Sequence, residues 1–225
     1  MENKPKIIAL VPAYNEERKI AEVVRAASRH LPVWVIDDGS KDGTATAAQE
    51  AGAVVLRQTP NQGKGNALKL GFRQALAAGV KAVITLDADG QHDPQEIPQF
   101  LGLYASQPAE LIIGSRQFER MPLVRRIANT SGNILMSWAL RTPILDNQSG
   151  YRLIGQRLMS ASLTSPLSGY EFEVDVLRLC LHNGWGLRWL PIQTIYADEK
   201  SSIKPFRHAW GFIRLALQIR MGRFG

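Results

Sequence analysis

The chain has 225 residues, a length that fits one large α/β domain better than two small ones. With 45% hydrophobic and 21% charged residues it has an ordinary globular composition, which excludes disordered, collagen-like and low-complexity classes. The formal net charge is +7, and six basic residues but no acidic one follow Glu199, so a nearly neutral body carries a basic C-terminal segment suited to an anionic partner.

Strand-like and helix-like segments alternate along the first half of the chain. Short apolar runs predict strands, and apolar residues spaced three and four apart predict helices between them. The predicted strands cover 7–11, 33–36, 54–56, 82–86 and 111–113, and the predicted helices cover 16–29, 44–51, 64–78 and 94–104. This alternation is typical of an α/β fold with a mostly parallel sheet and helices on both faces.

The second half of the chain is less regular. Its pattern predicts a polar turn at 146–150, and helices at 123–140, 170–182 and 206–221. A strand is predicted at 187–196, and Pro191 inside it indicates an edge or bent strand. We therefore expect a single domain over 1–205, followed by a basic amphipathic helix at 206–225.

Charged residues gather where the predicted strands end. Asp37 and Asp38 follow the second strand, Asp87 and Asp89 follow the fourth, and Arg116 follows the fifth. Ligands of open α/β sheets bind beyond the carboxyl ends of the strands. The sequence therefore predicts a binding site at this edge of the sheet.

The pair Asp87 and Asp89 is the strongest candidate for chemistry. Two carboxylates one residue apart at a strand end can share a divalent cation, and Gln91 adds a neutral oxygen ligand. Such ligands suit Mg²⁺ or Mn²⁺ rather than zinc. Taken alone, the same pattern also occurs as two solvated loop carboxylates. Asp37 and Asp38 could accept hydrogen bonds from a base or a ribose, or could form a plain turn.

Two basic features could hold phosphate. The glycine-rich loop 61–65 opens a predicted helix, so its backbone and Lys64 could cradle a phosphate, although Asn66 stands where a P-loop requires Ser or Thr. The basic cluster between Arg116 and Arg126 could bind a phosphate through two donors at once, or be a solvated helix start.

Six motifs occur in order along the chain: VPAYNE at 11–16, IDDGSKDGT at 36–44, NQGKG at 61–65, DADGQH at 87–92, GSR at 114–116 and DNQSGYR at 146–152. Together they resemble a family-2 glycosyltransferase, most closely the dolichyl- and polyprenyl-phosphate sugar transferases of the dolichol-phosphate mannose synthase type. The resemblance runs from about residue 6 to about residue 205, and it implies a GT-A fold, a nucleotide-sugar donor and Mg²⁺ or Mn²⁺.

The resemblance also implies roles for individual residues. It assigns the donor to Pro12, Tyr14, Glu16, Asp37, Asp38, Lys64 and Asp87, the metal to Asp87, Asp89 and Gln91, and the acceptor phosphate to Arg116 and Arg125. Asp89, Arg116 and Arg125 are thereby expected to be catalytic. Further candidates for the acceptor side or for a base are Asn129, Gln148, Arg152, Glu173 and Asp175. Asn129 stands where the family has serine, and Ser168 where it has lysine, so the donor stays open.

The implied activity is inverting transfer of one sugar from GDP-mannose or a UDP-sugar to a polyprenyl or dolichyl phosphate. Near pH 7 a phosphate monoester is already largely anionic and needs no strong base. A saccharide hydroxyl is the alternative acceptor, and it would need Glu173 or Asp175 as base. A different alternative is a non-catalytic nucleotide or nucleic-acid binder. Aromatic residues do not interleave with the basic ones across a sheet face, so we expect no nucleic-acid partner.

The cellular setting follows from composition and from the expected acceptor. Cys180 is the single cysteine, which excludes an intrachain disulfide and favours a reducing compartment. No signal peptide is recognisable after Met1, and no apolar stretch approaches the roughly 18–20 residues that span a bilayer. We expect a cytoplasmic enzyme, peripheral at the cytoplasmic face of an anionic membrane. Whether it forms a homo-oligomer is left open by the sequence.

Overall fold

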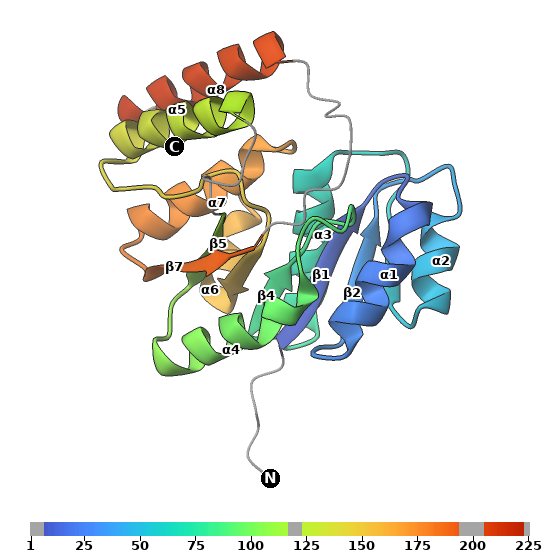
Figure 1. Cartoon of the computed structure of the whole chain (residues 1–225). Helices are drawn as coiled ribbons and strands as arrows, with labels where there is room; N and C mark the ends of the chain where they lie inside the picture. Colours follow the sequence, from blue (N-terminus) through green and yellow to red (C-terminus); the bar gives the residue numbers. More distant parts are fainter. Residues whose placement is uncertain (1–6, 117–122, 194–204, 223–225) are drawn as a thin grey trace.

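A seven-stranded sheet runs through the middle of the molecule, with helices on both of its faces (Figure 1). The structure, a computed structural model, describes residues 7–116, 123–193 and 205–222, with the side chains of 123–125 and 205–210 outside that description. The strands are β1 (Ile7–Ala13), β2 (Val33–Asp37), β3 (Val54–Arg57), β4 (Ala82–Thr85), β5 (Leu111–Arg116), β6 (Arg152–Gly155) and β7 (Leu187–Ile192). Their order in the sheet is β3-β2-β1-β4-β6-β5-β7.

Strand β6 runs against its neighbours, and the others run in parallel. β1 pairs in parallel with β2 and β4, and β2 pairs in parallel with β3. β6 pairs antiparallel with β4 and β5, and β7 pairs in parallel with β5. The predicted mostly parallel sheet is confirmed, but the sequence analysis missed β6. Pro191 lies in the edge strand β7, as predicted, whereas residues 194–196 of that predicted strand lie outside the described residues.

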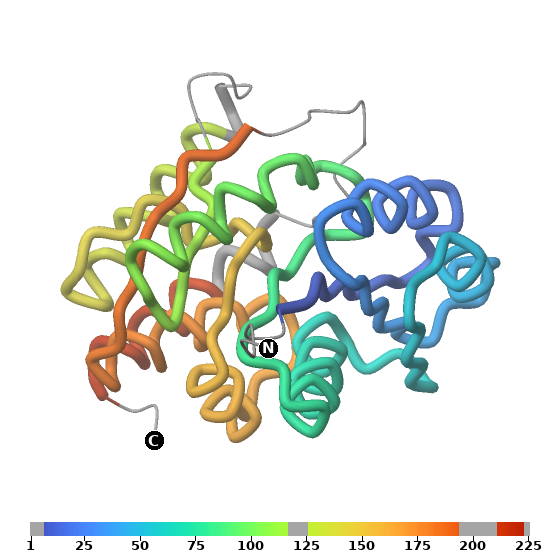
Figure 2. The backbone as a smooth tube through the Cα atoms, turned by 90° about the horizontal axis from the view of Figure 1, so that it is seen from below, coloured from blue at the N-terminus to red at the C-terminus, as the bar shows by residue number. Residues whose placement is uncertain are grey.

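The helices form two layers around this sheet. In Figure 2, α1 and α4 lie on one side of the sheet, and α3 and α6 lie on the other. A short 3₁₀ turn at Pro94–Glu96 leads into α4, and the seven-residue helix α6 was not predicted. The helices are α1 (Glu17–Ser28), α2 (Thr44–Glu50), α3 (Lys64–Ala77), α4 (Ile97–Ser106), α5 (Leu123–Leu140), α6 (Gln156–Ser162), α7 (Glu171–His182) and α8 (Pro205–Arg220).

Side chains of the central strands alternate between two hydrophobic cores. In β1, Ile8 and Leu10 belong to the core that contains Phe72 of α3, whereas Ala9 belongs to the core that contains Phe100 of α4. Successive side chains of a strand point to opposite faces, so a sheet covered on both faces buries nearly continuous apolar runs. This is why the strands of the first half stand out so clearly in the sequence.

The C-terminal helix α8 packs on the body of the chain. It lies beside α5 (Figure 1) and also contacts α7, and its Leu215 and Ala216 are buried in the same core as Phe72. The helix predicted at 206–221 is therefore confirmed. The predicted division of the chain into a domain over 1–205 and a C-terminal helix stays a prediction. Among the described residues, none of the helices is both long enough and apolar enough to span a bilayer.

Candidate functional site

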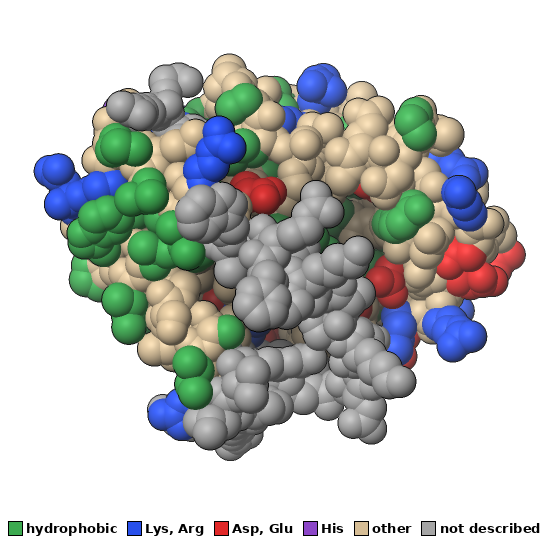
Figure 3. Space-filling model, turned by 90° about the horizontal axis from the view of Figure 1, so that it is seen from above, with side chains coloured by type: hydrophobic (Ala, Val, Ile, Leu, Met, Phe, Trp, Pro, Cys, Tyr) green, Lys and Arg blue, Asp and Glu red, His purple; other side chains and the backbone are tan. Residues whose placement is uncertain are grey.

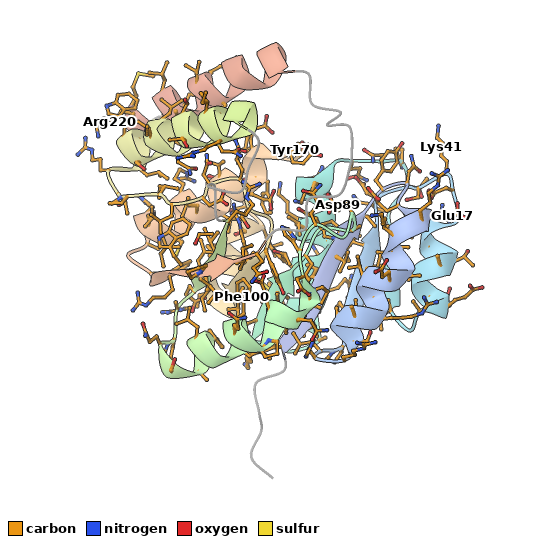
Figure 4. All side chains as sticks on the ribbon, viewed as in Figure 1. Glu17, Lys41, Asp89, Phe100, Tyr170 and Arg220 are labelled. Atoms are coloured by element: carbon orange, nitrogen blue, oxygen red, sulfur yellow. The ribbon has the colours of Figure 1, made fainter. Side chains whose placement is uncertain are left out.

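The carboxyl ends of three neighbouring parallel strands meet at one edge of the sheet. β1 ends at Ala13, β2 at Asp37 and β4 at Thr85, and the loops that follow carry most of the predicted donor and metal residues. Figure 4 shows Asp89 in the loop after β4 and Tyr170 at the start of α7, both at this end of the sheet. Residues that are far apart in the sequence are thus brought to one place.

Lys64, Asp87 and Glu173 form a charged cluster at this edge. Lys64 begins α3, and its Nζ lies 2.6 Å from Asp87 Oδ1 and 3.2 Å from Glu173 Oε2. Burial alone would lower the pKa of Lys64, but the two carboxylates raise it above its ordinary value. The pKa of Asp87 is held well below its usual range, because the attraction of Lys64 outweighs the opposing effect of burial. Lys64 and Asp87 are therefore both charged at neutral pH, and Glu173 is the third member of the cluster.

His92 holds the backbone of Asp87 in place. The Asp87 N–H donates to His92 Nδ1 (3.0 Å), so the imidazole is the neutral tautomer that carries its proton on Nε2. The ring stacks on Tyr151, with centroids 5.0 Å apart, and the Tyr151 hydroxyl donates to the Asp93 carbonyl (3.1 Å). Burial lowers the pKa of His92, which favours this neutral form. His92 therefore orients Asp87 through the backbone.

The glycine-rich loop is tied down by hydrogen bonds within the chain. The Asp38 carboxylate accepts from Gln62 N and Gly63 N, both at 2.8 Å. The Ser168 carbonyl accepts from Gly65 N (2.8 Å) and Asn66 N (3.3 Å). The amides of Gln62, Gly63 and Gly65 are thus already paired within the chain, and the loop contributes the Lys64 side chain to the charged cluster.

The predicted nucleoside residues divide into exposed and buried ones. Tyr14, just beyond β1, is 43% exposed, whereas Pro12 is buried in that strand and Glu16 is half-buried. Asp37 is fully buried; its Oδ2 lies 2.9 Å from Arg57 Nε, and its Oδ1 accepts from Ser40 N. Tyr14 can therefore meet a ligand directly, while Asp37 holds the turn after β2.

Arg116 forms an ion pair with Asp146, a residue for which the sequence predicted no individual role. Asp146 is 1% exposed, and its two oxygens accept from Arg116 Nε (2.7 Å) and Arg116 Nη2 (2.9 Å). Asp146 Oδ1 also accepts from Gln148 N and Ser149 N, at 3.1 and 3.2 Å. A fork-to-fork pair of this kind fixes the plane of a guanidinium group. A carboxylate shortly before a predicted site residue was the signal that could have identified it.

Two of the acceptor-side candidates point into the protein. Arg152 is fully buried, and it donates to the carbonyls of Ser149 (2.7 Å), Asn147 (3.1 Å) and Glu173. Burial lowers its pKa from the ordinary arginine value. Asp175, which is 1% exposed, accepts from Arg178 Nε at 2.6 Å. Of the two candidate bases, the structure therefore brings Glu173, but not Asp175, into contact with Lys64.

Three further residues were predicted for the acceptor side of the site. Gln148 is exposed and Asn129 is half-buried on α5, whereas the side chain of Arg125 lies outside the described residues. The roles predicted for these three residues stay predictions.

The strand-end oxygens suit Mg²⁺ or Mn²⁺. The Asp87 side chain is 30% exposed, and Asp89 and Gln91 are half-buried, so two carboxylates and an amide are within reach of solvent. The described residues contain no group of three or more His, Cys, Asp or Glu side chains that could hold a metal by itself. An incomplete set of hard oxygen ligands fits Mg²⁺-type ions, which retain waters and substrate phosphate oxygens. The donor set therefore fits a metal that is bound together with a diphosphate.

The sequence model described as Glycosyl transferase family 2 matches residues 8–163. The chain belongs to this family. The undecaprenyl-phosphate mannosyltransferase of Micrococcus luteus is 31% identical over 186 residues, with 76% of each chain covered. The UDP-N-acetylglucosamine–dolichyl-phosphate N-acetylglucosaminyltransferase of Methanococcus voltae is 27% identical over 218 residues, with 85% of this chain and 86% of that protein covered. The family resemblance of the sequence is thereby confirmed.

A solved glycosyltransferase has the same fold as this chain. Glucosyl-3-phosphoglycerate synthase of Mycobacterium tuberculosis, in complex with Mn²⁺, UDP and phosphoglyceric acid, superposes with a TM-score of 0.73 at 21% identity. The superposition covers 99% of this chain and 79% of that one. The predicted GT-A type of fold is confirmed, and the chain is a family 2 glycosyltransferase enzyme.

We predict that Gly150→Ala lowers the free energy of unfolding by about 1–3 kcal/mol, because it displaces packed groups. A Cβ at this position would lie 2.8 Å from Asp87 Oδ2 and 2.9 Å from Lys64 Nζ, so the ion pair would have to shift. Gly102→Ala on α4 is the matched control, since nothing lies within 4 Å of its Cβ position. It should be neutral or stabilise by up to about 1 kcal/mol through helix propensity. Urea unfolding of both variants measures the difference, and equal effects would contradict the close packing.

Proposed function

We propose that this family 2 enzyme transfers a sugar from a nucleotide-sugar donor to a polyprenyl phosphate, and that it requires Mg²⁺ or Mn²⁺. The proposal depends on the partly exposed pair Asp87 and Asp89. These residues follow β4, and Tyr14 follows its parallel neighbour β1, so all three lie at the same edge of the sheet. Relatives that are named for sugar transfer to undecaprenyl and dolichyl phosphate support this acceptor class.

The donor half of the site would be built on β1 and β2. The exposed ring of Tyr14 offers a face on which a nucleoside base can stack. Asp38 fixes the loop that leads to Lys64, and Lys64 offers its ammonium group to a diphosphate. Pro12, Glu16 and Asp37 support the same two strand ends.

Asp87, Asp89 and Gln91 would hold the metal. When bound, such an ion stabilises negative charge on the leaving diphosphate. Arg116, whose plane Asp146 fixes, and Arg125 would bind the acceptor phosphate. Because a phosphate monoester is already largely anionic near pH 7, the acceptor can attack without a strong base.

The position of Glu173 supports a second candidate function, in which the acceptor is a hydroxyl group. Glu173 Oε2 lies 3.2 Å from Lys64 Nζ, so a second acidic side chain is present beside the Lys64–Asp87 pair. If the acceptor is a saccharide hydroxyl, Glu173 is the base that we would assign. An acceptor panel that contains both a prenyl phosphate and a saccharide distinguishes the two candidates.

We also propose that the enzyme works at an anionic membrane surface. Exposed hydrophobic side chains gather on α5 and α8, namely Ile127, Ile134, Trp138, Ile213 and Leu217. Figure 3 gives the view from above, in which hydrophobic side chains cluster at this end of the molecule with Lys and Arg side chains around them. We refer to these five residues as the α5–α8 face.

Arginine residues accompany the α5–α8 face. The Arg220 guanidinium lies 5.3 Å from the centroid of the Trp138 ring, and Arg126 and Arg214 are exposed. Arginine stems can lie along apolar surface with their charged ends in water, and each basic residue near an anionic leaflet contributes about 1 kcal/mol. If the α5–α8 face rests on a membrane, the lipid chain of the acceptor can stay in the bilayer while the phosphate of the acceptor reaches the enzyme.

Asp89→Asn should lower turnover by about 10²–10³-fold, since loss of a metal ligand removes several kcal/mol of charge stabilisation. The assay presents GDP- and UDP-sugars with a short prenyl phosphate and saturating Mn²⁺, and the product is measured by mass spectrometry. Asp93→Asn is the matched control, because Asp93 caps the 3₁₀ turn by accepting from Gln95 N and asparagine caps equally well. Wild-type turnover in Asp89→Asn at saturating metal would contradict the metal assignment.

The double variant Ile134→Glu with Leu217→Glu should weaken binding to phosphatidylglycerol vesicles by about tenfold or more, because apolar area at the interface is lost. Vesicle sedimentation measures the binding. Activity on a membrane-embedded long-chain acceptor should fall much more than activity on a short soluble prenyl phosphate. Val54→Glu, at an exposed position on the far strand β3, is the control that should bind vesicles normally. Equal losses on both acceptors would indicate a structural role for the α5–α8 face.

A further inference from the structure

The ammonium group of Lys64 lies against the first carboxylate of the Asp87 and Asp89 pair. Its Nζ is 2.6 Å from Asp87 Oδ1 and 3.2 Å from Glu173 Oε2, and it lies 5.9 Å from the centroid of the Tyr170 ring. The side chains of Lys64 and Asp87 are 18% and 30% exposed, so the pair is partly shielded from water. A charge pair in such a setting is screened much less than one on the surface.

Among the described residues, the other basic side chains near this pair have partners of their own. Arg116 forms its two-pronged pair with Asp146, and Arg152 donates to backbone carbonyls. His92 Nδ1 accepts a hydrogen bond from the Asp87 N–H, so the ring is the neutral tautomer. The short ion pairs to both Asp87 and Glu173 thus come from Lys64.

A divalent cation on Asp87 would stand close to this ammonium group. Like charges within a few ångströms repel strongly in a partly buried site, and this repulsion weakens the binding of the metal alone. A nucleoside diphosphate changes the balance, because its oxygens can bind the metal and the ammonium group at the same time. Lysine can change its partner from a carboxylate to a diphosphate, since its charge is compact and sits on a flexible stem of four carbons.

The backbone around Lys64 is shaped for the close contact. Gly63 precedes α3 with φ = 90°, a left-handed conformation that favours glycine. A Cβ on Gly150 would come within 2.9 Å of Lys64 Nζ and 2.8 Å of Asp87 Oδ2. Glycines at these two positions therefore let the ammonium group reach Asp87.

We propose that Lys64 is a built-in counter-ion of Asp87 that makes metal binding conditional on the nucleoside diphosphate. Lys64 occupies Asp87 until the diphosphate arrives, and then it contacts the diphosphate while the metal takes its place between the carboxylates and the phosphate oxygens. The enzyme thereby takes up metal and donor together. This inference rests on the proposed function, because it assumes a diphosphate donor and a divalent metal.

The test is the affinity for Mn²⁺ itself, measured by electron paramagnetic resonance with no sugar donor present. Lys64→Met should bind Mn²⁺ about tenfold or more tightly than the wild type in the absence of nucleotide, since a repelling charge is removed. Addition of GDP or UDP should strengthen Mn²⁺ binding strongly in the wild type and only weakly in the variant. Lys69→Met is the matched control, because Lys69 lies on the same helix and donates to the Ser165 carbonyl. It should behave like the wild type.

Two further variants separate charge from shape. Lys64→Gln is a second neutral variant and should repeat the gain in Mn²⁺ affinity, whereas Lys64→Arg keeps the charge and should keep the weak binding of the wild type. Unchanged or weaker Mn²⁺ binding in the neutral variants, or equal gains in Lys64→Arg and Lys64→Gln, would overturn the inference. A wild-type enzyme that binds no Mn²⁺ even with GDP or UDP would overturn the metal dependence in the proposed function instead.

Discussion

An ammonium group shared by two carboxylates is the interaction on which this site depends. Lys64, Asp87 and Glu173 come from the start of α3, the loop after β4 and the first turn of α7. Burying charged groups is costly unless they are paired, so each of these three elements must approach the others closely. Glycine supplies the room: a Cβ on Gly65 would meet Phe172 and Ser168 of the α7 region at 2.7–2.8 Å. The order of the strands therefore determines which residues meet at the site. The ion pairs of Lys64 in turn hold the start of α3, the loop after β4 and the start of α7 together.

Three of the residues that would meet a ligand are held in place by a second residue. Asp146 fixes the plane of Arg116, and His92 fixes the backbone of Asp87. Asp38 holds the loop before Lys64 through two amides. Supporting contacts of this kind reduce the reorganisation that a reaction would otherwise require. Contacts within the chain thus fix the Arg116 side chain, the Asp87 backbone and the loop before Lys64.

The elements with a strong apolar pattern were predictable from the sequence, and the others were not. The strands that are buried on both faces, and the helices between them, lie close to where their periodicity predicts. β6 was missed because it is four residues long and begins with a charged residue, Arg152. Arg152 is buried because it donates to the carbonyls of Asn147, Ser149 and the more distant Glu173. The position of the site followed from the parallel topology, since charged residues after parallel strands must lie at one edge.

The partners of individual charged side chains could not be predicted from the sequence, because each side chain has several possible partners, both near and far along the chain. Asp37 faces Arg57, and Asp175 faces Arg178 rather than Lys64. The loop 61–65 was expected to offer its backbone to a phosphate, yet the amides of Gln62, Gly63 and Gly65 donate to Asp38 and Ser168. The spacing of residues in the sequence cannot reveal such pairings, since the competing partners come together only when the chain folds.

The most direct measurement is manganese anomalous diffraction from crystals of the enzyme with Mn²⁺ and a nucleoside diphosphate. The account predicts a single strong peak within about 2–2.5 Å of the Asp89 carboxylate and of diphosphate oxygens, with the Lys64 ammonium group on the diphosphate. A manganese peak remote from both Asp87 and Asp89 would contradict it.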